Sequence, residues 1–135
     1  PEDLTTIQSL GSVYMREEMW KEAIGLLRRS MVFHPNSPFL LEGLGKLLVS
    51  CPDPDLRNIN EGLMYSERAF VRSTSPPTIQ ISAGSYLATA YAALGDYSKA
   101  RYFINITLGL ARKNRVPEDY LKYLENMQKG FSFTN

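Results

Sequence analysis

An internal repeat constrains the fold of this chain more than any other feature of its sequence. Two segments, residues 4–35 and 81–112, align without a gap and carry small and large side chains in the same order. In repeats of this kind, each copy is one supersecondary unit whose apolar face is buried by the next copy. The aligned pairs are Leu10 with Leu87, Gly11 with Ala88, Tyr14 with Tyr91, Trp20 with Tyr97, Ala23 with Ala100, and Leu27 with Ile104.

A third, weaker copy lies between these two. Gly45 corresponds to Gly11 and follows it by 34 residues, whereas Gly62 corresponds to Ala23 and follows it by 39. Ala100 then follows Gly62 by 38 residues. Insertions of five and four residues explain the longer distances, and the chain is rich in turn-forming residues at the two places where they are needed. These places are residues 50–60 and 72–78.

Small side chains at the repeated positions predict close helix–helix contacts, because bulky neighbours fill the space beside them. Ser37-Pro38 and Asp53-Pro54 each place an N-cap residue before a proline, and Gly95-Asp96 ends one helix and begins the next. We therefore predict an all-α fold of about seven helices. Their predicted ranges are 4–17, 20–33, 38–50, 54–72, 78–94, 97–113 and 117–129. The bulky residues expected to pack beside the small ones are Leu10, Tyr14, Trp20, Leu27, Leu44, Leu87, Tyr91 and Tyr97.

The last predicted helix lies outside the repeat register. Leu121, Leu124 and Gln128 share one face of it, with Tyr120 and Met127 at the edges. A repeat array needs a terminal element whose outer face tolerates water, so we expect residues 117–129 to cap the array and to end at Gly130. The expected solvent side consists of Glu118, Lys122, Glu125 and Lys129.

The repeated pattern resembles the tetratricopeptide repeat (TPR) family, whose 34-residue unit is a pair of helices. The resemblance implies a right-handed superhelix of antiparallel helix pairs, a TPR-like α-solenoid, with repeats at about 4–37, 38–76 and 81–114 and a cap at 117–129. We expect residues 1–135 to form this single domain and to be a piece of a longer protein. The best-matching copy contributes Leu10, Gly11, Tyr14, Ala23, Leu27 and Pro35, and the departures are Leu48, Gly62 and Arg112, where the family has an aromatic residue, alanine and proline.

Composition argues against several classes of function. Hydrophobic residues make up 44% of the chain and charged residues 21%, as in a globular protein. The 15 Lys and Arg residues nearly balance the 14 Asp and Glu residues, so we expect no nucleic-acid partner. No apolar run approaches the roughly 18 residues of a membrane span, so we expect no membrane insertion within this segment.

Few residues are candidates for chemistry. With one cysteine and one histidine, no disulfide can form within the chain and no zinc site can be built from these residue types alone. Nucleotide-binding and hydrolase motifs are missing from the sequence, so we expect no enzymatic activity, catalytic residue, cofactor or metal. We interpret His34 as a helix C-cap, Cys51 as a loop thiol, and Arg28-Arg29 and Arg112–Arg115 as basic groups in last helical turns. The glycosylation sequon Asn105-Ile106-Thr107 falls in mid-helix, and we expect it to be unused.

The TPR resemblance also implies a binding surface, because the first helix of each pair lines a concave groove that receives a peptide or a partner helix. The family's carboxylate clamp of Lys, Asn and Arg is missing, since its positions hold Gln8, Ser12, Gly43, Ser82 and Tyr86. We therefore expect a partner of mixed or apolar character rather than an acidic chaperone tail. The predicted groove residues are Thr5, Gln8, Ser12, Met15 and Arg16, then Phe39, Glu42, Lys46 and Val49, then Ser82, Ser85, Thr89 and Ala92.

These observations favour a non-catalytic scaffold for protein–protein interaction, whose partner is a protein or peptide. One alternative is that the groove positions are solvated helix faces without a ligand. A second alternative is a self-association module that forms a homo-oligomer through Tyr102, Phe103 or Tyr123. A third is a hydrolase or transferase without a known motif, with His34 as its best candidate.

Overall fold

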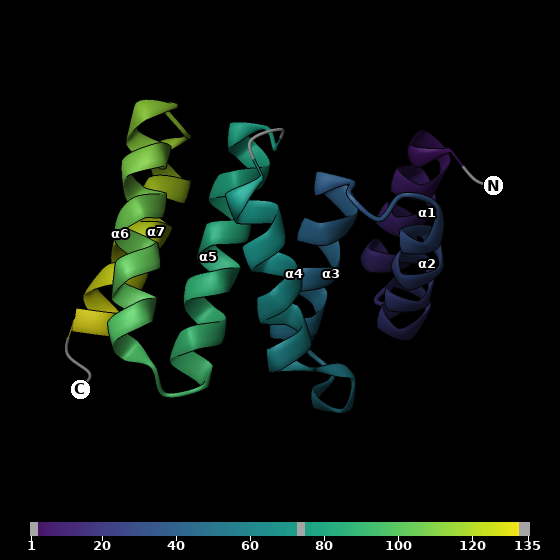
Figure 1. Cartoon of the computed structure of the whole chain (residues 1–135), viewed down its shortest axis with the longest axis horizontal. Coiled ribbons are helices and arrows are strands. Elements are labelled where there is room, and N and C mark those ends of the chain that lie inside the picture. Colours follow the sequence, from purple (N-terminus) through teal and green to yellow (C-terminus); the bar gives the residue numbers. More distant parts are fainter. Residues whose placement is uncertain (1–2, 73–74, 133–135) are drawn as a thin grey trace.

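A computed structural model describes residues 3–72 and 75–132, and these residues form seven α-helices, one short 3₁₀ helix and no strand (Figure 1). The prediction of an all-α fold with seven helices is confirmed. The helices are α1 (Leu4–Arg16), α2 (Trp20–Phe33), α3 (Pro38–Ser50), α4 (Ile59–Val71), α5 (Pro77–Ala93), α6 (Tyr97–Lys113) and α7 (Glu118–Ser132), with the 3₁₀ helix η1 (Pro54–Leu56) before α4.

Along the long axis of the molecule, α1 and α2 lie at one end, α3, α4 and α5 lie in the middle, and α6 and α7 lie at the other end (Figure 1). Each α-helix packs on the next one, and α3 also packs on α5. Three-residue turns join α1 to α2 and α5 to α6, so the helices of each of these pairs run in opposite directions. None of the described helices has the length and apolar character that crossing a membrane requires.

Aligned residues of the first and third copies end their helices in the same way. The N–H of Met19 donates to the carbonyl of Tyr14 at 2.7 Å, and the N–H of Asp96 donates to the carbonyl of Tyr91 at 2.9 Å. The residue before each donor adopts a left-handed conformation, with φ of 57° at Glu18 and 83° at Gly95. This geometry turns the chain back sharply and satisfies carbonyls at the helix end. The sequence repeat therefore corresponds to a repeated turn.

Three glycines mark the closest approaches between helices. A Cβ at Gly45 would collide with Oγ of Ser66, and one at Gly62 would lie 2.7 Å from Cγ2 of Val49, so α3 and α4 approach as predicted. The third position, Gly84 on α5, was not predicted as a contact point. A Cβ there would collide with Oγ1 of Thr107 on α6 and would lie 2.8 Å from Cε1 of Phe70 on α4.

Two packing predictions for the first copy are wrong. The nearest atom to a Cβ at Gly11 would be Cδ2 of Leu26 at 3.9 Å, an ordinary contact that would admit alanine. Leu10 is 38% exposed, whereas its aligned partner Leu87 is fully buried. The difference arises because α5 packs on α3, α4 and α6, while α1 packs chiefly on α2. Ile7 therefore supplies the large buried side chain of α1.

The core consists of three buried clusters. The first joins α1, α2 and α3 around residues such as Ile7, Leu27 and Leu44, with Tyr14 and Trp20 half-buried against it. The middle cluster joins α3, α4 and α5, and the last joins α5, α6 and α7. The members of the middle cluster are Leu41, Ala69 and Ala83, and those of the last are Ile81, Ala88, Ile104, Leu108, Ala111 and Leu124.

The predicted helix over 54–72 is wrong at its start. The carboxylate of Asp53 accepts a hydrogen bond from the N–H of Asp55, but this caps only η1. The chain then bends back, because the N–H of Asn58 donates to the carbonyl of Leu48 at 2.9 Å. The side chain of Asn58 caps α4 by accepting from the N–H of Glu61. By contrast, Ser37 and Asp96 cap α3 and α6 as predicted.

Helix α7 packs on α6 and continues beyond the predicted end at Gly130, as far as Ser132. Arg101 of α6 donates a 2.8 Å hydrogen bond to the carbonyl of Phe131, which also packs against the last core cluster. Of the predicted solvent side, Glu118, Lys122 and Lys129 are exposed, whereas Glu125 is half-buried.

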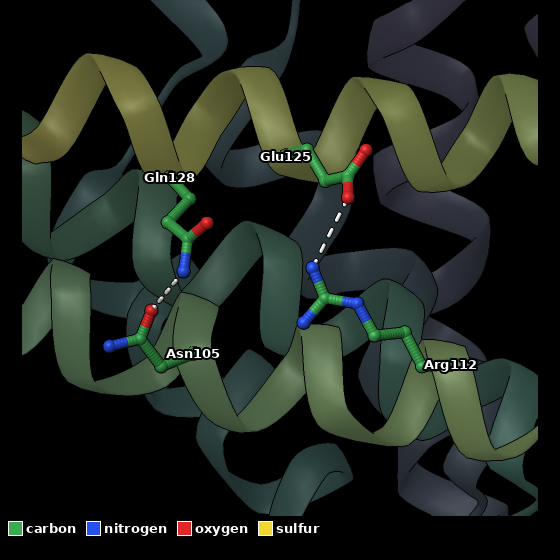
Figure 2. A network of polar contacts seen from close by, with 4 residues as sticks. All are labelled: Asn105, Arg112, Glu125 and Gln128. Atoms are coloured by element: carbon green, nitrogen blue, oxygen red, sulfur yellow. Dashed lines mark hydrogen bonds and ion pairs between the residues drawn. The ribbon is translucent and has the colours of Figure 1, made fainter.

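Polar contacts bridge the outer edge of the α6–α7 interface (Figure 2). Arg112 of α6 pairs with Glu125 of α7 at 3.2 Å, and Gln128 donates to Asn105 at 2.6 Å. These contacts fix the position of α7 beside α6, while Leu124 supplies its only fully buried side chain among the described residues.

Candidate partner-binding groove

Residues predicted to line the groove meet in one apolar hollow between α1, α2 and α3. The hollow has a volume of about 60 Å³. Met15 comes from α1, and Phe39, Glu42 and Lys46 come from successive turns of α3. Its floor and walls are completed by Gly11, Ala23, Leu27 and Gly43.

A second hollow continues from the first. It has a volume of about 280 Å³ and shares Met15 and Lys46 with the smaller one. Trp20 and Leu47 give it an apolar lining, and Ser50, Cys51 and Pro52 close it. Met15 and Lys46 therefore stand between two adjacent depressions of the same surface.

A hydrogen bond connects this surface to α5. The hydroxyl of Ser82 donates to Oε1 of Glu42 at 2.6 Å, so two predicted groove residues from α3 and α5 are in contact. Glu42 therefore lies where the hollow meets α5. Since a bond to a charged acceptor is stronger than one between neutral groups, it holds the carboxylate in a defined position.

Several predicted groove residues do not form part of an open groove. Ser85 is only 4% exposed and its hydroxyl donates to the carbonyl of Ser82, while Val49 is buried between α3 and α4. The hydroxyl of Thr89 donates to the carbonyl of Ser85 one turn back. Ser85 and Thr89 face inward because α5 packs on α3, α4 and α6.

The predicted groove residues of α1 remain separate from the hollows, apart from Met15. Thr5, Gln8, Ser12 and Arg16 are exposed. Arg16 lies 3.8 Å from Glu17, and both side chains are well exposed, so this ion pair contributes little to stability. Ala92, at the far end of α5, is half-buried.

Three tyrosines that were not predicted as groove residues extend the surface from α5 to α7. Tyr120 and Tyr123 of α7 lie with ring centroids 6.3 Å apart. Burial, with smaller contributions from the Tyr123 phenol and the Glu42 carboxylate, raises the pKa of Tyr86 on α5 to about 12. Burial also raises the pKa of Tyr120, against the opposing effect of a hydrogen bond with Ser85, with Glu42 again adding to the rise. Tyr86 and Tyr120 are thus both influenced by the charge of Glu42, and Tyr123 lies beside Tyr120.

The pH dependence of Tyr86 provides a test of this arrangement. The unfolded phenol ionises near pH 10, whereas the folded one remains protonated up to about pH 12. We therefore expect the free energy of unfolding to be unaffected by this group below pH 10 and to fall as the pH rises from 10 to 12, because ionisation favours the unfolded state.

An ultraviolet titration of phenolate absorbance should show one late step that Tyr86→Phe removes. Glu42→Gln should shift this step to lower pH, while Tyr102→Phe, at an exposed position on α6, should leave it unchanged. If Tyr86→Phe removed only absorbance that develops near pH 10, the buried environment assigned to this phenol would be wrong.

The candidates for chemistry occupy structural positions. His34 is the C-cap residue of α2, as predicted. Cys51 lies in the loop that follows α3, as predicted, where it is the buried C-cap residue of that helix and its carbonyl accepts a 2.6 Å hydrogen bond from Nε of Arg57. Within residues 3–72 and 75–132, no three His, Cys, Asp or Glu side chains gather closely enough to hold a metal ion.

The basic pair Arg28-Arg29 does not lie in the last turn of α2, contrary to prediction. Arg28 forms an ion pair with Glu61 at 2.6 Å and borders a hollow of about 440 Å³. That hollow, between α2 and residues 55–58, is lined by Lys21, Ile24, Gly25, Arg28, Asp55, Leu56, Arg57 and Asn58. Its charged lining consists of Lys21, Arg28 and Arg57 against Asp55, and Arg28 is already paired with Glu61. Arg112 and Lys113 do lie in the last turn of α6.

The residues predicted to mediate self-association differ in exposure. Tyr102 and Tyr123 are 61% and 53% exposed. Phe103 is instead packed, with its ring stacked on Tyr91 at 5.5 Å and edge-on to Phe70 at 5.8 Å. The prediction that Phe103 is an exposed aromatic is therefore wrong, because this side chain of α6 packs against Phe70 of α4 and Tyr91 of α5.

The sequon lies in mid-helix, as predicted. Thr107 of the sequon is fully buried and donates to the carbonyl of Phe103, while the side-chain oxygen of Asn105 accepts from Gln128. The flanking residues Ile104 and Leu108 are also fully buried.

Comparison with family models and with curated proteins does not identify a relative. No family model matches this chain, and no curated protein matches it. The case for a function therefore depends on the repeat and on the geometry of the surface.

Proposed function

We propose that this chain is a TPR-like α-solenoid with a right-handed superhelical arrangement of its helix pairs. The shared turn geometry of the first and third copies supports this, as does the contact between α3 and α5, the first helices of neighbouring pairs. In solenoids, such contacts between neighbouring repeats create an extended concave surface.

We further propose that the chain is a non-catalytic scaffold that binds a peptide or a partner helix on this surface. The observation that carries the proposal is the apolar hollow lined by Met15, Phe39, Glu42 and Lys46. Its lining residues come from the first and second sequence repeats. Apolar anchors entering such hollows supply most of the affinity in many complexes. Phe39 is the large apolar side chain of the groove and is half-buried rather than fully packed.

Selection from a random peptide library, followed by calorimetry, tests this function. Phe39→Ala should weaken the selected peptides about tenfold or more, because losing roughly 1.4 kcal/mol of apolar contact corresponds to a factor of ten. Phe33→Ala is the matched control, since Phe33 is an exposed phenylalanine at the end of α2. Peptides that are insensitive to Phe39→Ala and map to another face would contradict the proposal.

Self-association is the second candidate function, favoured by the exposed side chains of Tyr102, Tyr123, Leu10 and Val13. Leu10 and Val13 lie on α1, at one end of the stack, where a second copy would extend the array. Light scattering over a range of concentrations decides this point. A monomer at every concentration would remove this candidate and leave the scaffold proposal unaffected.

A further inference from the structure

Glu42 differs from the other half-buried carboxylates of the molecule. Glu61 on α4 pairs with Arg28, and Glu125 on α7 pairs with Arg112. Within the described part of the chain, no lysine, arginine or histidine forms an ion pair with Glu42. Its one hydrogen-bond donor there is the neutral hydroxyl of Ser82. A half-buried carboxylate is stabilised best by a cation, and no residue among 3–72 and 75–132 pairs with this one.

The surroundings of Glu42 are also suited to a cation. Aromatic rings carry negative potential on their faces and attract lysine and arginine side chains. Tyr120 and Tyr123 are nearly parallel, with an angle of 22° between their rings. Tyr120 forms a hydrogen bond with Ser85, whose hydroxyl donates to the carbonyl of Ser82, the residue that holds Glu42. The charge of Glu42 also affects the ionisation of Tyr86 and Tyr120. Acceptor oxygen and aromatic surface thus occur together between α3, α5 and α7.

The nearest cation on α3 does not neutralise this site. Lys46 follows Glu42 by one helical turn, yet its ammonium is not within ion-pair distance of that carboxylate in the described structure. Lys46 instead borders the two hollows beside Met15, whereas Glu42 reaches across to Ser82 on α5. The groove is therefore positive toward α1 and negative toward α5 and α7.

We propose that Glu42, Ser82 and the rings of Tyr86, Tyr120 and Tyr123 bind a basic side chain, arginine or lysine, of the partner segment. This inference rests on the proposed function, because the same segment places an apolar side chain in the hollow beside Phe39. The carboxylate pairs with the cation, the rings contact its charged head and its aliphatic stem, and Ser82 keeps the carboxylate in place. The partner is thus a segment in which a basic residue lies close to an apolar one.

The probe for this site is a phage-displayed library of random peptides selected on the intact chain. We expect the selected peptides to be enriched in arginine or lysine near an apolar residue. A synthetic copy of the best peptide with citrulline in place of arginine, or norleucine in place of lysine, should bind about tenfold more weakly. Glu42→Gln should weaken the original peptide by a similar factor and the neutral copy hardly at all, because the two changes remove the same interaction.

Controls separate this site from a general charge effect. Glu67→Gln removes an exposed carboxylate on α4 and should leave affinity unchanged. Tyr123→Leu, at an exposed position, should weaken the basic peptide several-fold without affecting the fold. Thermal melts followed by circular dichroism check that each variant is folded.

The outcomes distinguish this inference from the function on which it rests. Peptides that require Phe39 but contain no enriched basic residue, or that bind Glu42→Gln as tightly as the original chain, would overturn the cation site and leave the scaffold in place. Failure to select any peptide that depends on Phe39 would overturn both.

Discussion

Replacing Gly45 by alanine is expected to destabilise the protein by about 3 kcal/mol, at the upper end of the usual cost of overpacking a core. The added Cβ would collide with Oγ of Ser66 and would lie 3.0 Å from its backbone nitrogen and 3.2 Å from its Cα. Backbone atoms of α4 cannot rotate away as a side chain can. Relief therefore requires α3 and α4 to separate, which loosens contacts along both helices. Denaturant unfolding followed by circular dichroism measures the loss.

Gly109→Ala is the matched control, since it makes the same chemical change within a helix. Nothing lies within 4 Å of a Cβ at Gly109, so alanine should stabilise α6 by up to about 1 kcal/mol. Ser66→Ala combined with Gly45→Ala should restore little, because the backbone obstruction remains. If Gly45→Ala were neutral or stabilising, the close crossing of α3 and α4 would be wrong.

Gly84 offers an instructive contrast to Gly45. A Cβ at Gly84 would meet Oγ1 of Thr107 and ring atoms of Phe70, all of them side-chain atoms. Because side chains can be shortened or can move, Thr107→Ala should rescue much of the loss caused by Gly84→Ala. No second side-chain substitution can rescue Gly45→Ala in this way, because its Cβ would also meet backbone atoms of Ser66.

Replacing Leu124 by alanine is expected to cost about 3 kcal/mol and to release α7 from the stack. Leu124 is the one fully buried side chain of α7 in the described structure, and it packs with Ile104 and Leu108 of α6. Truncating a buried leucine typically costs 2–5 kcal/mol, because the lost contacts leave a cavity. Limited proteolysis should detect earlier cleavage within α7, and the pKa of Tyr86 should return toward 10 as Tyr123 moves away.

Two variants define what this result means. Lys122→Ala changes an exposed residue of α7 and should have almost no effect. Glu125→Gln removes the contact with Arg112 seen in Figure 2 and should cost less than about 1 kcal/mol, because that pair is largely solvated. Equal effects of Glu125→Gln and Leu124→Ala would show that polar contacts, rather than burial, hold α7 in place.

Local chemistry accounts for the parts of this fold that could be predicted. The caps at Ser37 and Asp96 depend on side chains that bond to the next turn, and Gly95 adopts the left-handed conformation that ends α5. Gly45 and Gly62 were recognised from the repeat, because few other reasons place glycine inside a helix. Each of these signals acts over a few residues and does not depend on distant parts of the chain.

Long-range contacts decided the parts that were predicted wrongly. Asp53-Pro54 carries a valid start signal, but the hydrogen bond from Asn58 to Leu48 diverts the chain, so α4 begins later. Leu10 and Leu87 occupy the same repeat position, yet only Leu87 has helices around it. The burial of a side chain depends on how many helices pack around its own helix, and a repeated pattern of residue types does not reveal how many there are.

The sequence by itself determined the all-α class and several helix ends, because caps and side-chain size act locally, while the family resemblance supplied the expected groove residues. Only the tertiary structure decided which of those residues are open, since Ser85 turned out to be buried while Met15 and Phe39 border a hollow. It also brought Tyr120 of α7 into hydrogen-bonding contact with Ser85 of α5. That proximity joins residues far apart in the chain, and only helix packing could bring them together.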